Sequence, residues 1–160
     1  MAQQIVELTC PGCGDRVTTG QTECRFCHKP IVISTFNSVY SMPMPEVSKY
    51  ANEYRKVLSE NPDNKDLNTS IAMCYLKLKL YDKALSAFEK AIEDNFDNSE
   101  TFFYAAVCLL QGNKAFLALR PTIDKIEEYI NAALMIEPKG IYYYFWSYIK
   151  YDYFNRKFFN

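Results

Sequence analysis

The sequence repeats itself at an interval of 34 residues, and this repeat constrains the fold more than any other feature. When segment 100–119 is placed on segment 66–96 from its start, Ala106 falls on Ala72 and Cys108 on Cys74. From Glu46 onward, the sequence pattern is typical of α-helices. A unit repeated at this length buries its apolar face by stacking on its neighbours. The sequence therefore predicts a mainly α-helical body made of stacked helices.

The first copy, residues 65–98, resembles a tetratricopeptide (TPR) repeat. Small and aromatic residues stand where that family has them, at Ala72, Tyr75, Tyr81, Ala84, Phe88 and Ala91. Alanine lets neighbouring helices approach, and a nearby aromatic ring fills the space beside it. The resemblance implies an antiparallel helix-pair solenoid with a second copy at 99–140 and partial copies at 46–64 and 141–160. The second copy has about eight extra residues near 114–121, so either its first helix or its turn is enlarged.

By this resemblance the first helices line a groove that binds peptides or protein surfaces. The groove positions would be Asp66, Thr69, Met73, Leu76 and Lys77 in the first copy, and Glu100, Phe103, Val107, Leu110 and Gln111 in the second. They do not supply the Lys/Asn/Arg clamp with which chaperone-binding members hold a C-terminal carboxylate. An apolar groove suits an amphipathic helix or an extended apolar segment. The alternative is that the linker or tail of this chain fills it.

Four of the six cysteines form two C-x-x-C pairs, Cys10 with Cys13 and Cys24 with Cys27. The start of the chain lacks the basic and apolar regions of a signal peptide, and no apolar run approaches the roughly 20 residues of a membrane span. We therefore expect a cytoplasmic protein, in whose reducing surroundings paired cysteines are better interpreted as metal ligands than as disulfides. Four thiolates suit one structural Zn²⁺, with a rubredoxin-like iron centre and a redox pair as alternatives.

The segment from about Ile5 to Ser34 resembles a zinc ribbon, which implies that all four cysteines are ligands. We expect strands at Ile5–Leu8 and Ile31–Ile33, and a short hairpin between the two pairs. Gly12 and Gly14 are expected to permit the φ > 0 backbone of a metal knuckle. A segment of about 30 residues needs such a metal because it cannot bury enough apolar surface alone.

His28 follows the fourth cysteine, but four thiolates already fill a tetrahedron, so we expect it to be a hydrogen-bonding neighbour of the site. A closed site of this kind has no open position for water and does not favour hydrolysis. The sequence contains no phosphate-binding glycine loop and no G-x-S-x-G motif, so we predict a non-enzymatic protein. Cys74 and Cys108 lie on apolar helix faces and are expected to be buried as small hydrophobes.

Residues 35–45 are expected to form a linker, because Pro43 and Pro45 oppose a regular element there. The predicted organisation is a zinc ribbon at 1–34, this linker, and a TPR-like helical domain at 46–160. The tail, 141–160, holds eleven aromatic residues, more than one helix face can bury. It either caps the stack by packing on Ile126, Ile130 and Ala133, or presents a surface for self-association, a partner or a membrane interface.

These features together predict a zinc-binding adaptor that recruits a protein or peptide. The net charge of −1 and the balanced charges of the cysteine segment do not favour nucleic acid as a partner. The alternative is a nucleic-acid-associated zinc ribbon whose repeats recruit other factors.

Overall fold

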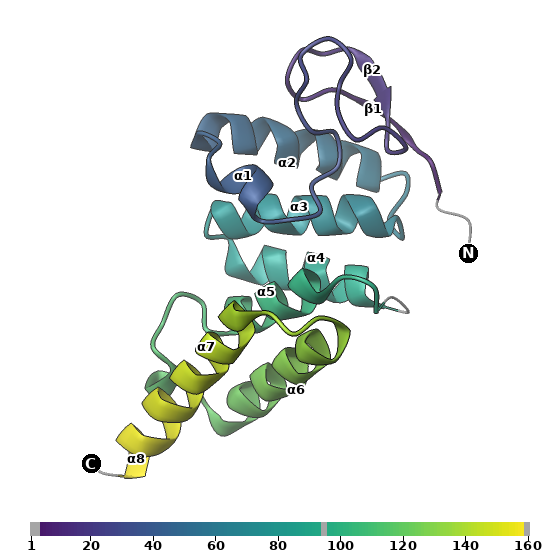
Figure 1. Ribbon diagram of the computed structural model, residues 1–160. Coiled ribbons are helices and arrows are strands. Elements are labelled where there is room, and N and C mark those ends of the chain that lie inside the picture. Colours follow the sequence, from purple (N-terminus) through teal and green to yellow (C-terminus); the bar gives the residue numbers. More distant parts are fainter. Residues whose placement is uncertain (1–3, 94–95, 159–160) are drawn as a thin grey trace. The chain divides into compact units, whose positions relative to one another are not determined.

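The computed structural model describes residues 4–93 and 96–158, and its helices dominate (Figure 1). The chain divides into two compact units, Met1–Ala91 and Ile92–Asn160. The first contains β1 (Glu7–Thr9), β2 (Arg16–Thr18), α1 (Asn37–Tyr40), α2 (Met44–Leu58), α3 (Lys65–Lys77) and α4 (Tyr81–Ile92), whose last residue lies past the boundary. The second contains α5 (Ser99–Leu109), the 3₁₀ helix η1 (Ala115–Leu117), α6 (Arg120–Ile136), α7 (Gly140–Ile149), the π-helical segment η2 (Lys150–Asn155) and α8 (Arg156–Phe158). The predicted mainly helical fold with a small N-terminal β element is confirmed.

The cysteine-rich head, residues 7–33, contains a two-stranded antiparallel hairpin. Strand β1 pairs with β2 so that Leu8 lies opposite Val17, and both side chains are buried. The first cysteine pair forms the connection between the two strands. The sequence placed the hairpin between the two pairs instead, and that prediction is wrong because the partner of β2 precedes the first pair.

The predicted strand at Ile31–Ile33 is also wrong. These residues form no strand, although Ile31 and Ile33 are fully buried. Their backbone bonds are divided between the head and the helices. The Ile31 N–H donates to the Thr22 carbonyl, whereas the Tyr54 hydroxyl donates to the Ile31 carbonyl and the Ile33 N–H donates to Ser70 Oγ. The apolar pattern therefore indicated burial correctly but not the type of backbone structure.

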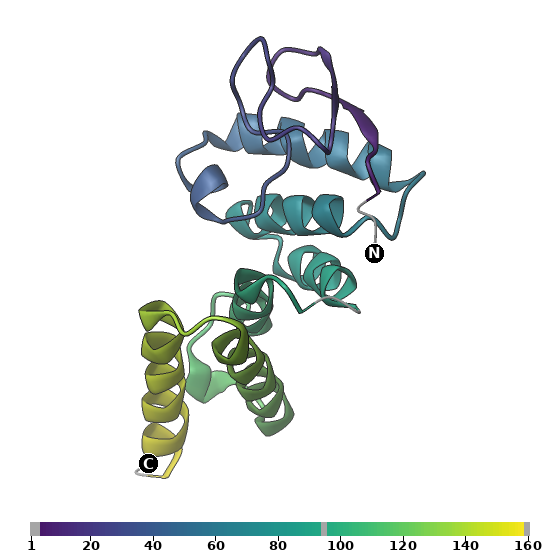
Figure 2. The same ribbon diagram turned by 45° about the vertical axis from the view of Figure 1, so that its right-hand side comes forward.

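Helices α2 and α3 lie side by side and carry the head (Figures 1 and 2). Pro43 precedes α2 and Pro45 lies in its first turn, where proline is tolerated. The Asn64 side chain caps α3 by accepting a hydrogen bond from the Leu67 N–H. Residues 67–74 of α3 are all buried, so this helix is the centre of the first unit.

The predicted linker is partly helical. Residues 37–40 form the single turn α1, which packs against α3 and buries Val39 completely. Lys77 of α3 donates to the Tyr40 carbonyl and lies 4.9 Å above the Tyr40 ring. The two prolines lie at the start of α2, and they do not prevent a helical turn at residues 37–40.

Helices α3 and α4 are the pair expected for residues 65–98. They are joined by a short turn at Leu78–Leu80, in which Lys79 has a φ of 59°. The residues of α4 that were assigned to small and large packing positions, Ala84, Phe88 and Ala91, are all buried. The positions of α4 that the sequence predicted to pack are therefore buried in the structure.

In the second unit α5 packs against α6, and α7 packs against α6 in turn. The extra residues near 114–121 enlarge the connection between α5 and α6 and form η1, so the longer-turn alternative is the one observed. Ile126, Ile130 and Ala133 of α6 are fully buried, as expected beneath a capping helix.

The enlarged connection is held by the C-terminal tail. Asp152 of η2 is only 5% exposed, and its carboxylate accepts a hydrogen bond from the Phe116 N–H and pairs with Arg156. The Ala115 N–H donates to the Tyr148 hydroxyl, and the Arg156 guanidinium lies over the Phe116 ring. The insertion thus provides a packing surface for the tail.

The tail buries only part of its aromatic content. Tyr142 and Tyr153 are buried, whereas Tyr143, Tyr144 and Tyr151 are 53%, 73% and 66% exposed. Both sequence alternatives therefore hold in part, since the tail packs on the unit and also presents aromatic surface.

Candidate metal centre

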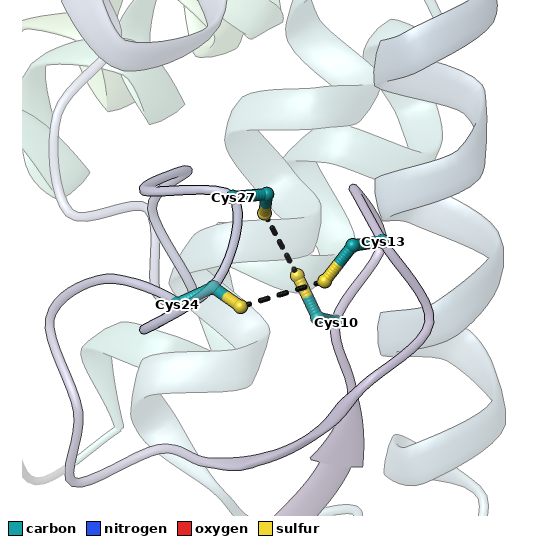
Figure 3. Close-up of side chains that lie close together, drawn as sticks. All are labelled: Cys10, Cys13, Cys24 and Cys27. Atoms are coloured by element: carbon teal, nitrogen blue, oxygen red, sulfur yellow. Dashed lines mark hydrogen bonds between the residues drawn. The ribbon is translucent and has the colours of Figure 1, made fainter.

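The four N-terminal cysteines converge on one point. Figure 3 shows their sulfurs directed toward one another from two loops, and all four lie within 4.8 Å of each other. The Cys10 and Cys27 sulfurs are 3.6 Å apart, and those of Cys13 and Cys24 are 3.5 Å apart. A tetrahedron with Zn–S bonds of about 2.3 Å has edges of roughly 3.8 Å, so the spacing fits a tetrahedral thiolate site. None of the four is in a disulfide.

The two cysteine turns share one backbone design. In the first, the Gly14 N–H donates to the Cys10 carbonyl and the Cys10 N–H donates to the Asp15 carbonyl. The second repeats both bonds fourteen residues later, from His28 to Cys24 and from Cys24 to Lys29. This equivalence arises from the shared C-x-x-C spacing and brings two matching loops together at the sulfurs.

Each turn closes with a left-handed residue directly after its second cysteine. Gly14 has φ 83° and His28 has φ 56°. Glycine adopts this conformation at little cost, whereas a residue with a Cβ is strained there. The prediction for Gly14 is confirmed, and the second turn places a histidine where glycine would be easier.

Gly12 has another role from the one predicted, because it is not among the residues with positive φ. A Cβ at this position would lie 2.8 Å from Lys29 Cδ and 3.0 Å from Cys27 Sγ. The glycine therefore lets the second cysteine turn approach the first. Sequence reasoning missed this role because it depends on a contact across the site.

Backbone amides stabilise the thiolate of the first cysteine in the second turn. The N–H groups of Cys27 and Phe26 donate to its sulfur and lower the pKa of Cys24 to about 7. The Asp15 amide favours the Cys13 thiolate in the same way, but the neighbouring sulfurs outweigh it and raise the pKa of Cys13 to about 12. Burial raises the pKa of Cys10. Four sulfurs this close cannot all carry negative charge unless a cation sits among them.

His28 is not part of the sulfur cluster. Its side chain is exposed, and its Nδ1 lies 3.7 Å from the Glu23 carboxylate. Among the described residues, the group that could hold a metal ion consists of the four cysteines alone. Such a set is closed, because its four donors complete a tetrahedron.

The head is attached to α2 and α3 by polar contacts. The Glu53 carboxylate accepts a hydrogen bond of 2.8 Å from the Thr9 N–H, and Glu46 forms an ion pair with Lys29 beside the second turn. The Tyr50 hydroxyl donates to the Pro30 carbonyl. Burial raises the pKa of Tyr50, which keeps it a donor at neutral pH. Sequence reasoning missed Tyr50 and Tyr54, because their polar partners lie 20 or more residues away in the chain.

The predicted groove residues of the first copy lie on a covered face. Met73 is fully buried, Thr69 and Leu76 are buried, and Asp66 and Lys77 are half-buried. The segment that contains Ile33 and α1 lies against this helix, as the contacts of Ser70 and Lys77 show. Residues of the linker thus occupy space beside this part of the predicted groove.

The groove residues of the second copy are placed differently. Phe103 is buried, with its ring centre 4.7 Å from that of Tyr142 and 5.5 Å from that of Phe145. Leu110 is also buried, whereas Val107 is half-buried and Gln111 is exposed. Glu100 is half-buried and pairs with Lys139. The side chains of this copy that reach solvent are therefore mainly polar.

The remaining two cysteines are core residues. Cys74 and Cys108 are buried, and burial raises the pKa of each to about 12. Their thiols stay protonated at neutral pH and are poor nucleophiles. They provide matched controls for the metal site.

Comparison with known protein families gives a match for one part of the helical region. Residues 51–106 match the tetratricopeptide repeat family, a segment that runs from within α2 to within α5. A search of curated proteins found no match, and a search of solved structures found none. No described helix combines the length and apolarity needed to cross a bilayer. Residues 51–106 are therefore similar to tetratricopeptide repeats, and they follow four cysteines whose sulfurs are placed to hold a metal ion.

Proposed function

We propose that this protein is a non-enzymatic adaptor, in which a zinc-stabilised head is joined to TPR helices that bind a protein partner. The repeat match over residues 51–106 is the observation that carries the proposal, because the family's helices bind proteins. The cysteine cluster supports the zinc part. We place the protein in a reducing compartment such as the cytoplasm, where the four thiols stay available to a metal.

The proposed metal is one structural Zn²⁺ bound by Cys10, Cys13, Cys24 and Cys27. Bound zinc supplies no reactive position here and contributes folding free energy, roughly 10–16 kcal/mol in small zinc domains. The support is the sulfur spacing, the amide donors to sulfur, and the Gly12 contact. Iron in the same tetrahedron is the competing assignment, and a spectrum separates the two because only ferric thiolate sites absorb strongly in the visible.

The proposed partner is an amphipathic or apolar segment bound along the predicted groove. In the first copy it would displace the linker at α1 or contact only Asp66 and Lys77, because Met73 is buried. In the second copy Val107 and Gln111 reach solvent.

The groove is tested by co-purification from a cell extract with quantitative mass spectrometry. The Val107→Asp/Gln111→Glu double variant should lose partners that the native chain retains. The Lys49→Glu/Lys56→Glu variant, altered at two exposed sites on α2, should keep them. Equal recovery with the groove variant would reject the groove.

Nucleic-acid binding is the second candidate, and one feature of the head favours it. A hollow of about 320 Å³ is lined by Arg16, Arg25 and Phe26, and Phe26 is 73% exposed. An exposed ring can stack on a base while arginines contact phosphates. The same hollow is also lined by Glu7 and Asp15, whose charges oppose phosphate.

Filter binding of a single-stranded 12-nucleotide RNA tests this candidate. Affinity that falls steeply with salt and is lost in Arg16→Glu/Arg25→Glu would support it. Absence of binding at 50 mM salt would reject it.

The exposed aromatics of the tail are a proposed site of self-association. Tyr143 and Tyr144 of α7 and Tyr151 of η2 are exposed. Sedimentation of the native chain and of a variant with serine at all three positions tests this. A concentration-dependent dimer that is lost in the variant is the expected result.

A further inference from the structure

The first unit has an open hollow on the side of α3 that the predicted groove does not use. It has a volume of about 390 Å³ and is lined by residues of α3 and α4 and by the end of α2. Ile71 and Tyr75 contribute from α3. At 3.6 residues per turn they lie about half a turn around the helix axis from Asp66, Met73 and Lys77. The predicted face is covered by the linker, whereas this one is hollowed and open.

The floor of the hollow is apolar. Leu58 of α2, Ile71 of α3 and Ala87 of α4 line it, and the half-buried Tyr75 ring adds an aromatic wall. Its volume lies near the lower end of small-molecule sites, which span about 300–1,000 Å³. It has room for one or two side chains of a ligand and not for a whole helix.

Asn68 gives the hollow a fixed hydrogen-bond acceptor. This residue is only 4% exposed, and its Nδ2 donates to the Pro62 and Asn64 carbonyls at 2.8 and 3.0 Å. These two bonds fix the amide orientation, because carbonyl oxygens require the nitrogen to face them. Its Oδ1 accepts no hydrogen bond from the described part of the chain. Because Asn68 lines the hollow, Oδ1 is the amide atom that remains for a ligand there.

Two lysines on α4 give the rim a positive charge. Lys83 and Lys90 are exposed, lie two helical turns apart, and form no ion pair with any described residue. Asp82 is the acidic member of the lining, so the lining has one more positive than negative side chain. The rim therefore complements a ligand with carboxylates.

We propose that this hollow binds a short, extended, acidic peptide segment of a protein partner. One apolar side chain of the peptide enters between Ile71 and Ala87, a peptide N–H donates to Asn68 Oδ1, and carboxylates face Lys83 and Lys90. The inference rests on the adaptor function but assigns the partner to a different face from the predicted groove. It requires neither displacement of the linker nor exposure of Met73.

The test is selection of random 12-residue peptides displayed on phage against the zinc-loaded full chain. Selected peptides are then labelled and measured by fluorescence anisotropy. Enriched peptides should be acidic and should share at least one Leu, Ile or Phe. Their affinity should fall as sodium chloride rises from 50 to 500 mM, because salt screens the lysine contacts.

Three variants locate the binding. Ser86→Trp places a large side chain on the exposed lining of the hollow and should weaken binding more than tenfold. Lys83→Glu/Lys90→Glu should weaken it about tenfold by reversing the rim charge. Lys49→Glu/Lys56→Glu makes the same charge change on exposed α2 positions outside the lining and should stay within twofold. Circular dichroism confirms that each variant folds.

Two outcomes would overturn the inference. One is that selection enriches no acidic peptide. The other is that selected peptides bind Ser86→Trp and the charge-reversed variant as tightly as the native chain. If binding instead falls with Val107→Asp/Gln111→Glu, the adaptor proposal stands and only the assignment to this hollow fails.

Discussion

At the scale of single residues, the proposed metal site depends on backbone geometry as much as on the four sulfurs. Gly14 and His28 close equivalent turns in the left-handed region, and Gly12 leaves room for Cys27 Sγ. The C-x-x-C spacing gives the first half of this design, because two cysteines three apart can share one tight turn. The spacing cannot predict the close approach of Gly12 to Cys27, because that contact exists only once both turns are folded.

Glycine substitutions distinguish close approach from backbone conformation. In Gly12→Ala the new methyl group meets a ligand sulfur at 3.0 Å, so zinc affinity should fall at least tenfold. In Gly14→Ala the new methyl group meets nothing within 4 Å, but the backbone at this position has φ 83°. The substitution should therefore lower stability by about 1 kcal/mol through backbone strain. Competition with a chromophoric chelator measures the first effect, and thermal unfolding the second.

The control for both is Gly140→Ala at the start of α7, where an added Cβ meets nothing within 4 Å and φ is not positive. It should leave zinc affinity unchanged. Equal zinc affinity in Gly12→Ala and Gly140→Ala would contradict the role given to Gly12.

At the scale of elements, the enlarged α5–α6 connection and the tail stabilise each other through Asp152. The repeat pattern located the insertion, because extra residues are recognised as a departure from the fixed 34-residue interval. It could not say what the insertion contacts, because its hydrogen bonds go to residues 30 or more positions away. The wrong strand at Ile31–Ile33 has a similar origin, since a short apolar run does not reveal whether its partner is a sheet or a helix.

Asp152→Ala should release the connection from the tail. It removes the acceptor for the partly buried Phe116 N–H and the partner of Arg156, so unfolding free energy should drop by about 2–3 kcal/mol. Amide exchange at Ala115 and Phe116 should accelerate. The measurements are urea unfolding and hydrogen exchange followed by NMR.

Asp124→Ala is the matched control. Asp124 is also paired with an arginine four residues away, but both side chains are more than half exposed. Exposed pairs of this kind contribute about 0.3–0.5 kcal/mol. If the two alanine variants lost the same stability, Asp152 would not anchor the connection.

At the scale of the whole molecule, the cysteine head is built into the first compact unit. Tyr50, Tyr54 and Ser70 bond to the backbone of residues 30–33, and α1 packs on α3. The sequence predicted the TPR segment well, because its alanines and aromatics recur at a fixed interval. It did not predict that the linker packs on α3, since that depends on how one short segment folds back on a helix.

Metal removal should therefore affect the first unit selectively. In the full chain, chelation should raise hydrogen exchange in residues 7–33 and α1, and more moderately in α2 and α3, because these segments bond to the head. Residues 99–158 should change least, since α5, α6 and α7 have a core of their own. Hydrogen exchange with mass spectrometry measures this. A uniform increase in hydrogen exchange along the chain would contradict the prediction that the metal stabilises the first unit selectively.

Native mass spectrometry with elemental analysis tests most directly whether the four cysteines bind one zinc ion. The native chain should carry one zinc per chain and no disulfide. Cys24→Ser should carry almost none, while Cys74→Ala, which removes a buried thiol outside the cluster, should retain a full equivalent. A native chain that holds no metal, or that holds disulfides among Cys10, Cys13, Cys24 and Cys27, would contradict the account.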